Sequence, residues 1–394
     1  LVHTPDGRYV IDVARFRGED LLSDLSDRDF TVNAMAVDLT GSIDQLIDPL
    51  NGEADAKAKI LRRCSDHALF DDPVRVLRAV RQSVQFDMRI EPQTVHDIKA
   101  ARPYLQRVSA ERTRDEFIKL LALTQPRKAL RVLDALGILA DIVPETGSLR
   151  SLTPHSADYA DGWQETLSVI EKVSQLVTAI SPRRTEDTGA SFGLGMVVMQ
   201  LDRYRQRLRE HIEQVWPNDR SHSALLVLSV LLHGASGEAA AARAQALRLS
   251  NAERDRLMLL VRFAKLPLEL EDVAPLTVHH FWRRTGTAGV DVCLLAGAYS
   301  LAQYGSEVDQ NAWLIVIERL LALLDAYYEH YDELVEPPIL LDGNQLMSRL
   351  EIEPGPVVGL LLDRIREAQV LGTVHSADEA LQLARSVLAE TPHN

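Results

Sequence analysis

Residues 71–81 of the chain read DDPVRVLRAVR and predict a helix with an apolar face and a charged face. Pro73 suits the first turn of a helix, and the aspartates before it suit the positive end of the helix dipole. At about 100° per residue, Arg75, Arg78 and Arg81 share one side, and valine and leucine side chains occupy the other. Guanidinium groups bind phosphate in a bidentate manner, and a carboxylate accepts from an exocyclic amine. The stretch therefore indicates either a nucleotide-binding helix or a solvated helix with an Asp–Arg pair.

The amino-terminal part of the sequence has a different pattern, typical of strands and turns. Residues 4–7 read TPDG and precede the strand-like run 8–16, which predicts a β-hairpin. A second run of β type covers residues 30–39, and alternating residues of a strand point to one side. The polar residues that lie along this second run or at its entry are Arg28, Asp29, Thr31 and Asn33. Because one hairpin cannot complete a sheet, we expect a further segment before Leu1.

From residue 53 onward the apolar residues recur with a helical period, so we expect a mainly α fold (α+β) with a small β portion. The 46% hydrophobic and 25% charged residues are ordinary for a globular protein. No apolar run approaches the ~20 residues that a membrane-spanning helix needs, which excludes a membrane protein. Cys64 and Cys293 are the only cysteines, which excludes a disulfide scaffold and favours a reducing, cytoplasmic compartment.

Charge is distributed unevenly along the chain. The formal net charge is −14, yet residues 61–133 hold 15 lysine and arginine residues against nine aspartate and glutamate residues. A basic helical segment in an acidic protein predicts contact with a polyanion such as RNA. Within it, Arg102 and Arg107 lie outside the motif 71–81 and are our candidate RNA-binding residues. The alternative is a solvated helix face with internal salt bridges.

Four stretches between residues 27 and 116 occur in a meaningful order. They read DRDFTVNA at 27–34, IDPLNG at 47–52, DDPVR at 71–75 and RTRDE at 112–116. In this order they resemble the motifs of the class II nucleotidyltransferases, which comprise the CCA-adding tRNA nucleotidyltransferases and the bacterial poly(A) polymerases. Two positions depart from the family pattern, because Asp27 stands where the family has arginine and Asp71 where it has glutamate.

The resemblance implies a role for each motif. Asp72 and Arg75 would read the base, since cytosine and adenine both show an amine donor beside a ring-nitrogen acceptor. Arg28, Arg78 and Arg81 would hold phosphates or orient that pair. The residues implied to support the motifs structurally are Asp29, Asn33, Arg112 and Glu116.

The resemblance also implies Mg²⁺ as cofactor, with Asp12 as a catalytic carboxylate. The family's Gly-Gly-x-Val-Arg-Asp loop and Asp-x-Asp metal pair precede the hairpin and have no counterpart in this sequence. Asp12 alone cannot hold two ions, so no metal site is complete and we expect this chain by itself to be inactive.

By the same resemblance the chain divides into four parts. They are the remnant of a nucleotidyltransferase head at 1–52, a helical neck at 53–145, a helical body at 146–335 and a helical tail at 336–394. Residues 159–167 resemble the start of an HD phosphohydrolase-like body. His233 is followed by Gly234 where such a body has aspartate, so we expect the body to be degenerate and without a metal site.

The function implied is the template-independent addition of C and A nucleotides to tRNA 3′ ends from CTP and ATP. Poly(A) addition by the same kind of site remains an alternative, because both reactions use one ATP pocket. A non-catalytic RNA-binding protein is a second alternative, since the metal-binding aspartate pair is missing. A helical interaction protein that has kept the motifs by descent is a third.

Overall fold

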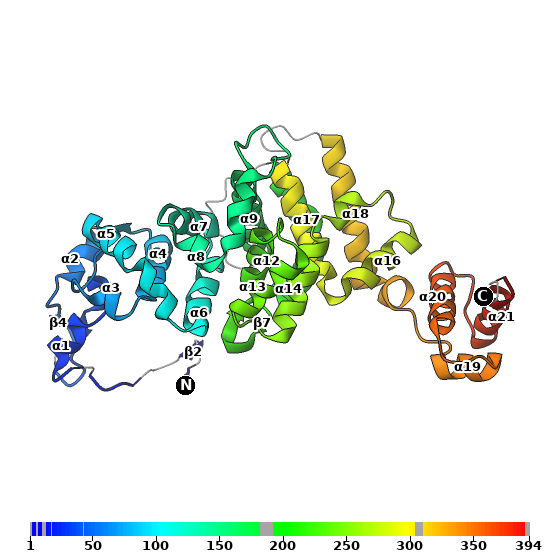
Figure 1. The fold of residues 1–394 in the computed structure, drawn as a ribbon, viewed down its shortest axis with the longest axis horizontal. Helices are drawn as coiled ribbons and strands as arrows, with labels where there is room; N and C mark the ends of the chain where they lie inside the picture. Colours follow the sequence, from blue (N-terminus) through cyan, green and yellow to red (C-terminus); the bar gives the residue numbers. More distant parts are fainter. Residues whose placement is uncertain are drawn as a thin grey trace. The chain divides into compact units, whose positions relative to one another are not determined.

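The computed structural model describes residues 2–4, 7–9, 13–16, 18–41, 43–181, 192–303 and 310–390. The chain forms two compact units, the first from Leu1–Pro144 with Ala246–Arg248 and the second from Glu145–Gln245 with Leu249–Asn394. Helices dominate both units and the strands are two or three residues long, so the mainly α prediction is confirmed (Figure 1). None of the helices in the described ranges has the length and apolar character needed to span a membrane.

The first unit begins with the predicted hairpin. Strand β1 (Val2–Thr4) pairs antiparallel with β2 (Gly7–Tyr9), with Val2 opposite Tyr9. Residues 13–16 form no regular structure, so the strand predicted over 8–16 is wrong in its second half. After helix α1 (Leu21–Ser26), strands β3 (Ala36–Val37) and β4 (Leu46–Ile47) form a second antiparallel pair.

The prediction of a strand through Asp29, Thr31 and Asn33 is wrong. Residues Thr31–Asn33 form the 3₁₀ helix η1, and only Phe30 makes an isolated bridge, to Arg63. The cause is local, because Asp29 Oδ1 accepts from the Phe30 amide at 2.9 Å and from the Asn33 side chain at 3.0 Å. Side-chain bonds of this kind offer the backbone an alternative to a strand ladder.

The IDPLNG stretch connects strand β4 to helix α2 (Gly52–Lys57) and contributes the first residue of that helix. Asp48 accepts from the amides of Gly52 at 2.7 Å and Glu53 at 2.9 Å, which satisfies two donors at the helix start. Asn51 adopts the left-handed conformation, with φ of 56°. Gly52 packs directly on η1, where a Cβ atom would overlap the carbonyl oxygen of Thr31. The motif therefore lets α2 pack closely against η1, which follows Asp29 in the chain.

The rest of the first unit is a helical cluster. Helix α4 confirms the helix predicted from residues 71–81, although it begins at Arg75, after a turn through Pro73. Its valine and leucine side is buried as predicted, against α6 (Ala110–Leu121) and α7 (Pro126–Ala135). Strands β5 (Ile60–Leu61) and β6 (Arg89–Ile90) pair in parallel beside it. The helices of this cluster are α3 (Ala68–Asp71), α4 (Arg75–Gln85), α5 (Pro92–Ala101), η2 (Arg102–Arg107), α6 (Ala110–Leu121), α7 (Pro126–Ala135) and α8 (Ile138–Ile142).

The second unit is built around helix α17 (Gly289–Gln303), nearly all of which is buried. It packs against α9 (Gly162–Ile180) and α18 (Gln310–Glu329), and α12 (His222–Leu231) packs between α9 and α14 (Asn251–Phe263). The shorter helices are η3 (Pro144–Ser151), α10 (Phe192–Leu201), η4 (Asp202–Tyr204), α11 (Arg205–Ile212), η5 (Pro217–Asp219), α13 (Gly237–Ala246), α15 (Leu266–Glu269), α16 (Pro275–Thr285), η6 (Gly286–Ala288) and the π-helix η7 (Tyr331–Val335). Strands β7 (Val215–Trp216) and β8 (Arg220–Ser221) form a small antiparallel pair.

Three helices at the carboxy-terminal end have a hydrophobic core of their own. They are α19 (Gly343–Leu350), α20 (Pro356–Val370) and α21 (Ala377–Glu390). Leu346, Leu361 and Ile365 are fully buried in that core, together with the small side chains of α21. Helix α20 also contacts α16, through Arg283 and Asp363, whose charged atoms lie 2.5 Å apart.

Replacing Gly52 by alanine should destabilise the first unit by about 1–3 kcal/mol, because the new methyl group must displace the backbone of Thr31. Peptide-level hydrogen exchange of residues 48–57 would measure the loss. Gly41→Ala in the same unit is the control, since its Cβ would lie at an ordinary 3.5 Å from Asp38 Oδ2. Equal protection in Gly52→Ala and in the unaltered protein would contradict the close packing of α2 on η1.

Candidate nucleotide-binding site

The first unit brings together residues from three of the motifs found in the sequence. Asp29 of the 27–34 motif lies just before η1, and Asp72 follows helix α3. The three arginines lie on α4, and Arg112 and Glu116 lie on α6. Charged side chains of each motif form ion pairs with side chains of another motif.

Asp72 is the centre of the site. Its Oδ2 atom accepts from Arg112 Nη2 at 2.7 Å and lies 4.0 Å from Arg75 Nε. Its Oδ1 atom is buried and has no hydrogen-bond partner among the described residues. A buried carboxylate oxygen without a partner is costly, so this atom is an acceptor in need of a donor.

Arg75 is buried, with only 7% of the residue exposed, and differs from the exposed guanidinium that the helical pattern predicts. Nη2 donates to the carbonyl of Asp27 at 2.7 Å, and Nη1 donates to the carbonyls of Ala68 at 3.0 Å and Arg28 at 3.3 Å. These bonds hold α4 against the loop that follows α1. They use Nη1 and Nη2, the two outer nitrogens of the guanidinium. Nε lies on the side of Asp72 and makes no hydrogen bond among the described residues.

The other two arginines of α4 are ion-paired. Arg78 Nη2 lies 2.9 Å from Asp29 Oδ2, and Arg81 Nε donates to Glu116 Oε2 at 2.8 Å. Arg78 Nε is buried and has no hydrogen-bond partner in the described part of the chain. Asn33 links the same loop to α4, because its side-chain amide donates to Gln82 at 3.0 Å.

The remaining predicted residues lie outside this group. Arg28 pairs with Asp24 at 3.0 Å, one turn earlier in the chain, and is half exposed. The Arg102 guanidinium makes a bidentate hydrogen bond to the Asp141 carboxylate, at 2.5 and 2.8 Å, and packs on Gly137. Arg107 stacks on the Tyr104 ring, 4.4 Å from its centroid. Asp12 lies outside the described residues.

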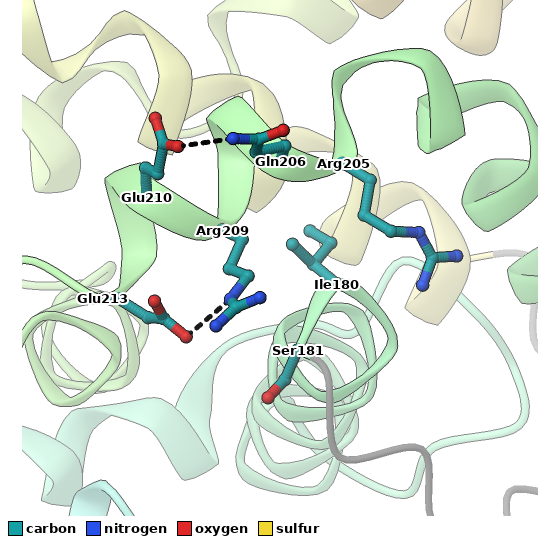
Figure 2. A pocket seen from close by; sticks show the side chains of 7 residues that line it. All are labelled: Ile180, Ser181, Arg205, Gln206, Arg209, Glu210 and Glu213. Atoms are coloured by element: carbon teal, nitrogen blue, oxygen red, sulfur yellow. Dashed lines mark hydrogen bonds and ion pairs between the residues drawn. The ribbon is translucent and has the colours of Figure 1, made fainter. Parts of the chain in front are cut away.

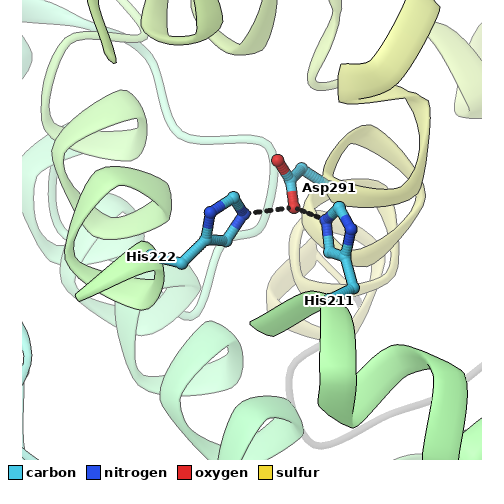
Figure 3. Close-up of side chains that lie close together, drawn as sticks. All are labelled: His211, His222 and Asp291. Carbon is cyan, nitrogen blue, oxygen red and sulfur yellow. Dashed lines mark hydrogen bonds and ion pairs between the residues drawn. The ribbon is translucent and has the colours of Figure 1, made fainter. Parts of the chain in front are cut away.

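A metal-type cluster occurs elsewhere, in the second unit, and the sequence analysis missed it. His211 Nε2 lies 2.6 Å and His222 Nε2 lies 2.9 Å from the same oxygen of Asp291 (Figure 3). It is the only metal-type group in the described ranges. Because up to 80 residues separate the three side chains, no local spacing signals them.

Arg256 already supplies the cation that Asp291 needs. Its Nε donates to Asp291 Oδ2 at 2.7 Å, and its Nη1 donates to Thr287 at 2.9 Å. Burial by itself would raise the pKa of Asp291, but the hydrogen bonds from His211 and His222 hold it far below its usual value. A divalent ion at this position would lie close to the guanidinium, so we interpret the cluster as a buried ion-pair network that joins α11, α12, α14 and α17.

The two histidines of the part that resembles an HD body, His155 and His233, both contact other side chains. His155 Nδ1 lies 3.1 Å from Glu165 Oε1, and His233 lies beside the ring of Tyr299. Burial, together with the charges of Lys265 and His155, lowers the pKa of His233 to about 4. His233 is therefore neutral at pH 7, next to a glycine that offers no carboxylate.

Two family models match the chain. One is described as the poly A polymerase head domain and matches residues 3–62. The other is described as the probable RNA and SrmB-binding site of polymerase A and matches residues 87–149. The head model thus ends one residue after strand β5, and the RNA-binding model covers α5 to α8.

The chain is also similar to curated proteins over most of its length. It is 29% identical over 383 residues to the A-adding tRNA nucleotidyltransferase of Deinococcus radiodurans, covering 95% of this chain and 81% of that protein. It is 28% identical to the CC-adding tRNA nucleotidyltransferase of Geobacter sulfurreducens, covering 97% and 78%. Over most of its length the chain is therefore similar to the class II nucleotidyltransferases, a family whose members generally use divalent metal ions.

Solved structures show the same fold. The structure of a CCA-adding enzyme in its apo form I superimposes with a TM-score of 0.59 at 22% identity, over 96% of this chain and 75% of the other. A Thermotoga maritima CCA-adding enzyme complexed with tRNA gives a TM-score of 0.52 at 21% identity, over 93% and 74%.

The described residues do not by themselves form the divalent metal site of this family. No three metal-ligating side chains converge in the described residues of the first unit. Its buried Asp29 is already committed to Arg78, Phe30 and Asn33.

Replacing Asp291 by asparagine should cost about 3–5 kcal/mol of unfolding free energy, because Arg256 would remain buried without its counter-ion. All four tryptophans lie in the second unit, so urea unfolding followed by tryptophan fluorescence reports on that unit. The control is Asp255→Asn on α14, the helix that carries Arg256; its exposed pair with Arg254 should contribute about 0.2–1 kcal/mol. Equal midpoints for the two variants would refute the role given to the network.

Proposed function

We propose that this protein adds cytidine and adenosine nucleotides to the 3′ end of tRNA, with CTP and ATP as substrates. The observation that carries the proposal is the Asp72 carboxylate: its buried Oδ1 has no hydrogen-bond partner among the described residues, and its Oδ2 lies 4.0 Å from the Nε of Arg75. An acceptor next to a donor complements the Watson–Crick edge of both cytosine and adenine. Guanine and uracil present the reversed pattern and would leave both protein groups unpaired.

The local structure supports recognition by a rigid pair. Three carbonyls hold the Arg75 fork, and Arg112 holds the second oxygen of Asp72, so neither side chain has to be ordered when the nucleotide arrives. Preorganised groups lose less entropy on binding and discriminate better between substrates. The bases would thus be selected by protein atoms, without a nucleic acid template.

The triphosphate would lie against the arginines that surround the pair. Arg78 Nε has no hydrogen-bond partner among the described residues, and Arg78 Nη2 would exchange Asp29 for a phosphate oxygen. Arg81 and Arg28 would hold phosphates or orient the pair by the same exchange of a carboxylate for a phosphate. Asp29, Asn33 and Glu116 would hold these arginines in place, as the ion pairs and hydrogen bonds of the site suggest.

For the metal ion we propose Mg²⁺, a hard cation that binds carboxylate and triphosphate oxygens. It would activate the RNA 3′-hydroxyl and neutralise the leaving pyrophosphate. Asp12 is the residue of this sequence that we propose as a ligand. The two cysteines, Cys64 and Cys293, are both free, in keeping with the cytoplasm as the compartment.

RNA would contact the helices that follow the site. The RNA-binding model covers residues 87–149, and the basic stretch 61–133 overlaps it. Arg107 and Arg102 remain the proposed contacts, with Arg107 the more accessible because Asp141 already binds the Arg102 fork. We also propose the division into head (1–52), neck (53–145), body (146–335) and tail (336–394). The relatives are named for tRNA, which favours tRNA over poly(A) tails.

Replacing Asp72 by alanine should remove most of the preference for ATP and CTP over GTP and UTP. The difference in binding free energy between the two pairs of nucleotides should fall by about 1–3 kcal/mol for each lost base contact. Equilibrium dialysis of the four nucleotides measures this without requiring turnover. The matched control is Asp71→Ala. The Asp71 side chain is exposed, and its carboxylate makes a long ion pair with His67, at 3.7 Å. Unchanged nucleotide preference in Asp72→Ala would remove Asp72 from the base-binding site.

The function itself is tested by incorporation of CMP and AMP into a tRNA that lacks its 3′ CCA end. Incorporation of labelled CMP or AMP is the expected result for the complete enzyme. Addition of long adenosine tracts to non-tRNA transcripts, with no preference for tRNA, would favour poly(A) polymerase activity and contradict the proposal.

A further inference from the structure

The second unit contains two open hollows, each of about 540 Å³, whose charges differ. The first lies beside α11 and is shown in Figure 2. There Arg209 pairs with Glu213 at 2.8 Å, and Arg205 donates to Asp202 and to a backbone carbonyl. Because its cations are matched by carboxylates, this hollow offers no net attraction for an anion.

The second hollow has an excess of positive charge. Arg262 from the end of α14, Lys265 from the turn that follows, and Arg284 from the end of α16 all line it, with Glu269 as the one carboxylate. Leu259, Phe263 and Leu266 form its apolar walls. Three cations and one anion thus meet at one place in a chain whose net charge is −14.

The cations of this hollow are available to a ligand. Arg284 and Arg262 are exposed, and neither has an ion pair or hydrogen bond among the described residues. The contrast with Arg283, next to Arg284 in the chain, is sharp, because Arg283 lies 2.5 Å from Asp363. Lys265 also lines the hollow and is partly buried, and its ammonium group lies 4.9 Å from the centroid of the Tyr299 ring.

We propose that this hollow binds a backbone phosphate of the RNA substrate, which makes the body a second RNA contact distant in sequence from the base-reading residues. Arginine forks bind phosphate oxygens in a bidentate manner, and a lysine adds a point charge. The hollow is open and its walls are apolar, as suits a group on a continuous polymer. This inference rests on the proposed function, because it takes RNA as the substrate.

The same phosphate chemistry occurs in free nucleotides and in pyrophosphate, and the experiment has to separate these sources. Neutralising one phosphate contact should lower the slope of log affinity against log salt by about one unit. We therefore propose binding titrations of fluorescently labelled tRNA lacking its 3′ CCA end, over a series of KCl concentrations. Parallel titrations use inorganic pyrophosphate and ATP.

Arg284→Gln is the test variant and Arg283→Gln is its matched control. Both remove one positive charge from adjacent exposed positions of α16, and only Arg284 lines the hollow. We expect Arg284→Gln to weaken tRNA binding several-fold at low salt and to flatten the slope, with ATP binding unchanged. Arg283→Gln should match the unaltered protein, and Arg262→Gln should reproduce the effect of Arg284→Gln.

The outcomes separate the two proposals. If the unaltered protein binds tRNA with a steep salt dependence and Arg284→Gln behaves like Arg283→Gln, the hollow is not an RNA contact. If Arg284→Gln weakens pyrophosphate or ATP binding and leaves tRNA unaffected, the hollow serves a free phosphate compound and the inference is overturned. If the unaltered protein fails to bind tRNA at all, the proposed function fails together with the inference.

Discussion

The buried guanidinium of Arg75 is the contact on which the arrangement of the site depends. A buried charge is tolerated only when its hydrogen-bonding capacity is used, and here three backbone carbonyls use the outer nitrogens of the fork. Two of these carbonyls belong to the loop after α1 and one to α3, so a single side chain from α4 fixes three segments. Asp72, Asp29 and their arginine partners take their positions from that frame.

Two arginines of the candidate site are ion-paired with carboxylates, and a phosphate could take the place of each carboxylate. Arg78 with Asp29 and Arg81 with Glu116 are close pairs at the edge of a buried region. A phosphate offers a guanidinium the same geometry as a carboxylate does, with more negative charge. In the proposed function, a nucleotide phosphate would replace a carboxylate at these arginines, whose side chains are 37% exposed in Arg78 and 17% exposed in Arg81.

The second unit uses buried charge for a different purpose. In the Asp291 network the cation comes from Arg256 and two histidines complete the hydrogen bonding, so the carboxylate holds four helices together. The same three side chains without Arg256 would resemble a metal site. The neighbouring guanidinium decides between the two interpretations, since it compensates the charge that a divalent ion would otherwise neutralise.

Helical periodicity determined most of the fold, because the apolar face of α4 and the long helices after residue 53 follow from a repeat that local sequence carries. The motifs likewise picked out Asp72, Arg75 and Arg112, whose side chains lie close together in the structure. The sequence did not show that Arg75 is buried, that residues 31–33 form a 3₁₀ turn, or that His211, His222 and Asp291 meet. Each of these depends on hydrogen bonds between segments or on side-chain bonds to the backbone, and no residue pattern specifies such partners until the tertiary structure brings them together.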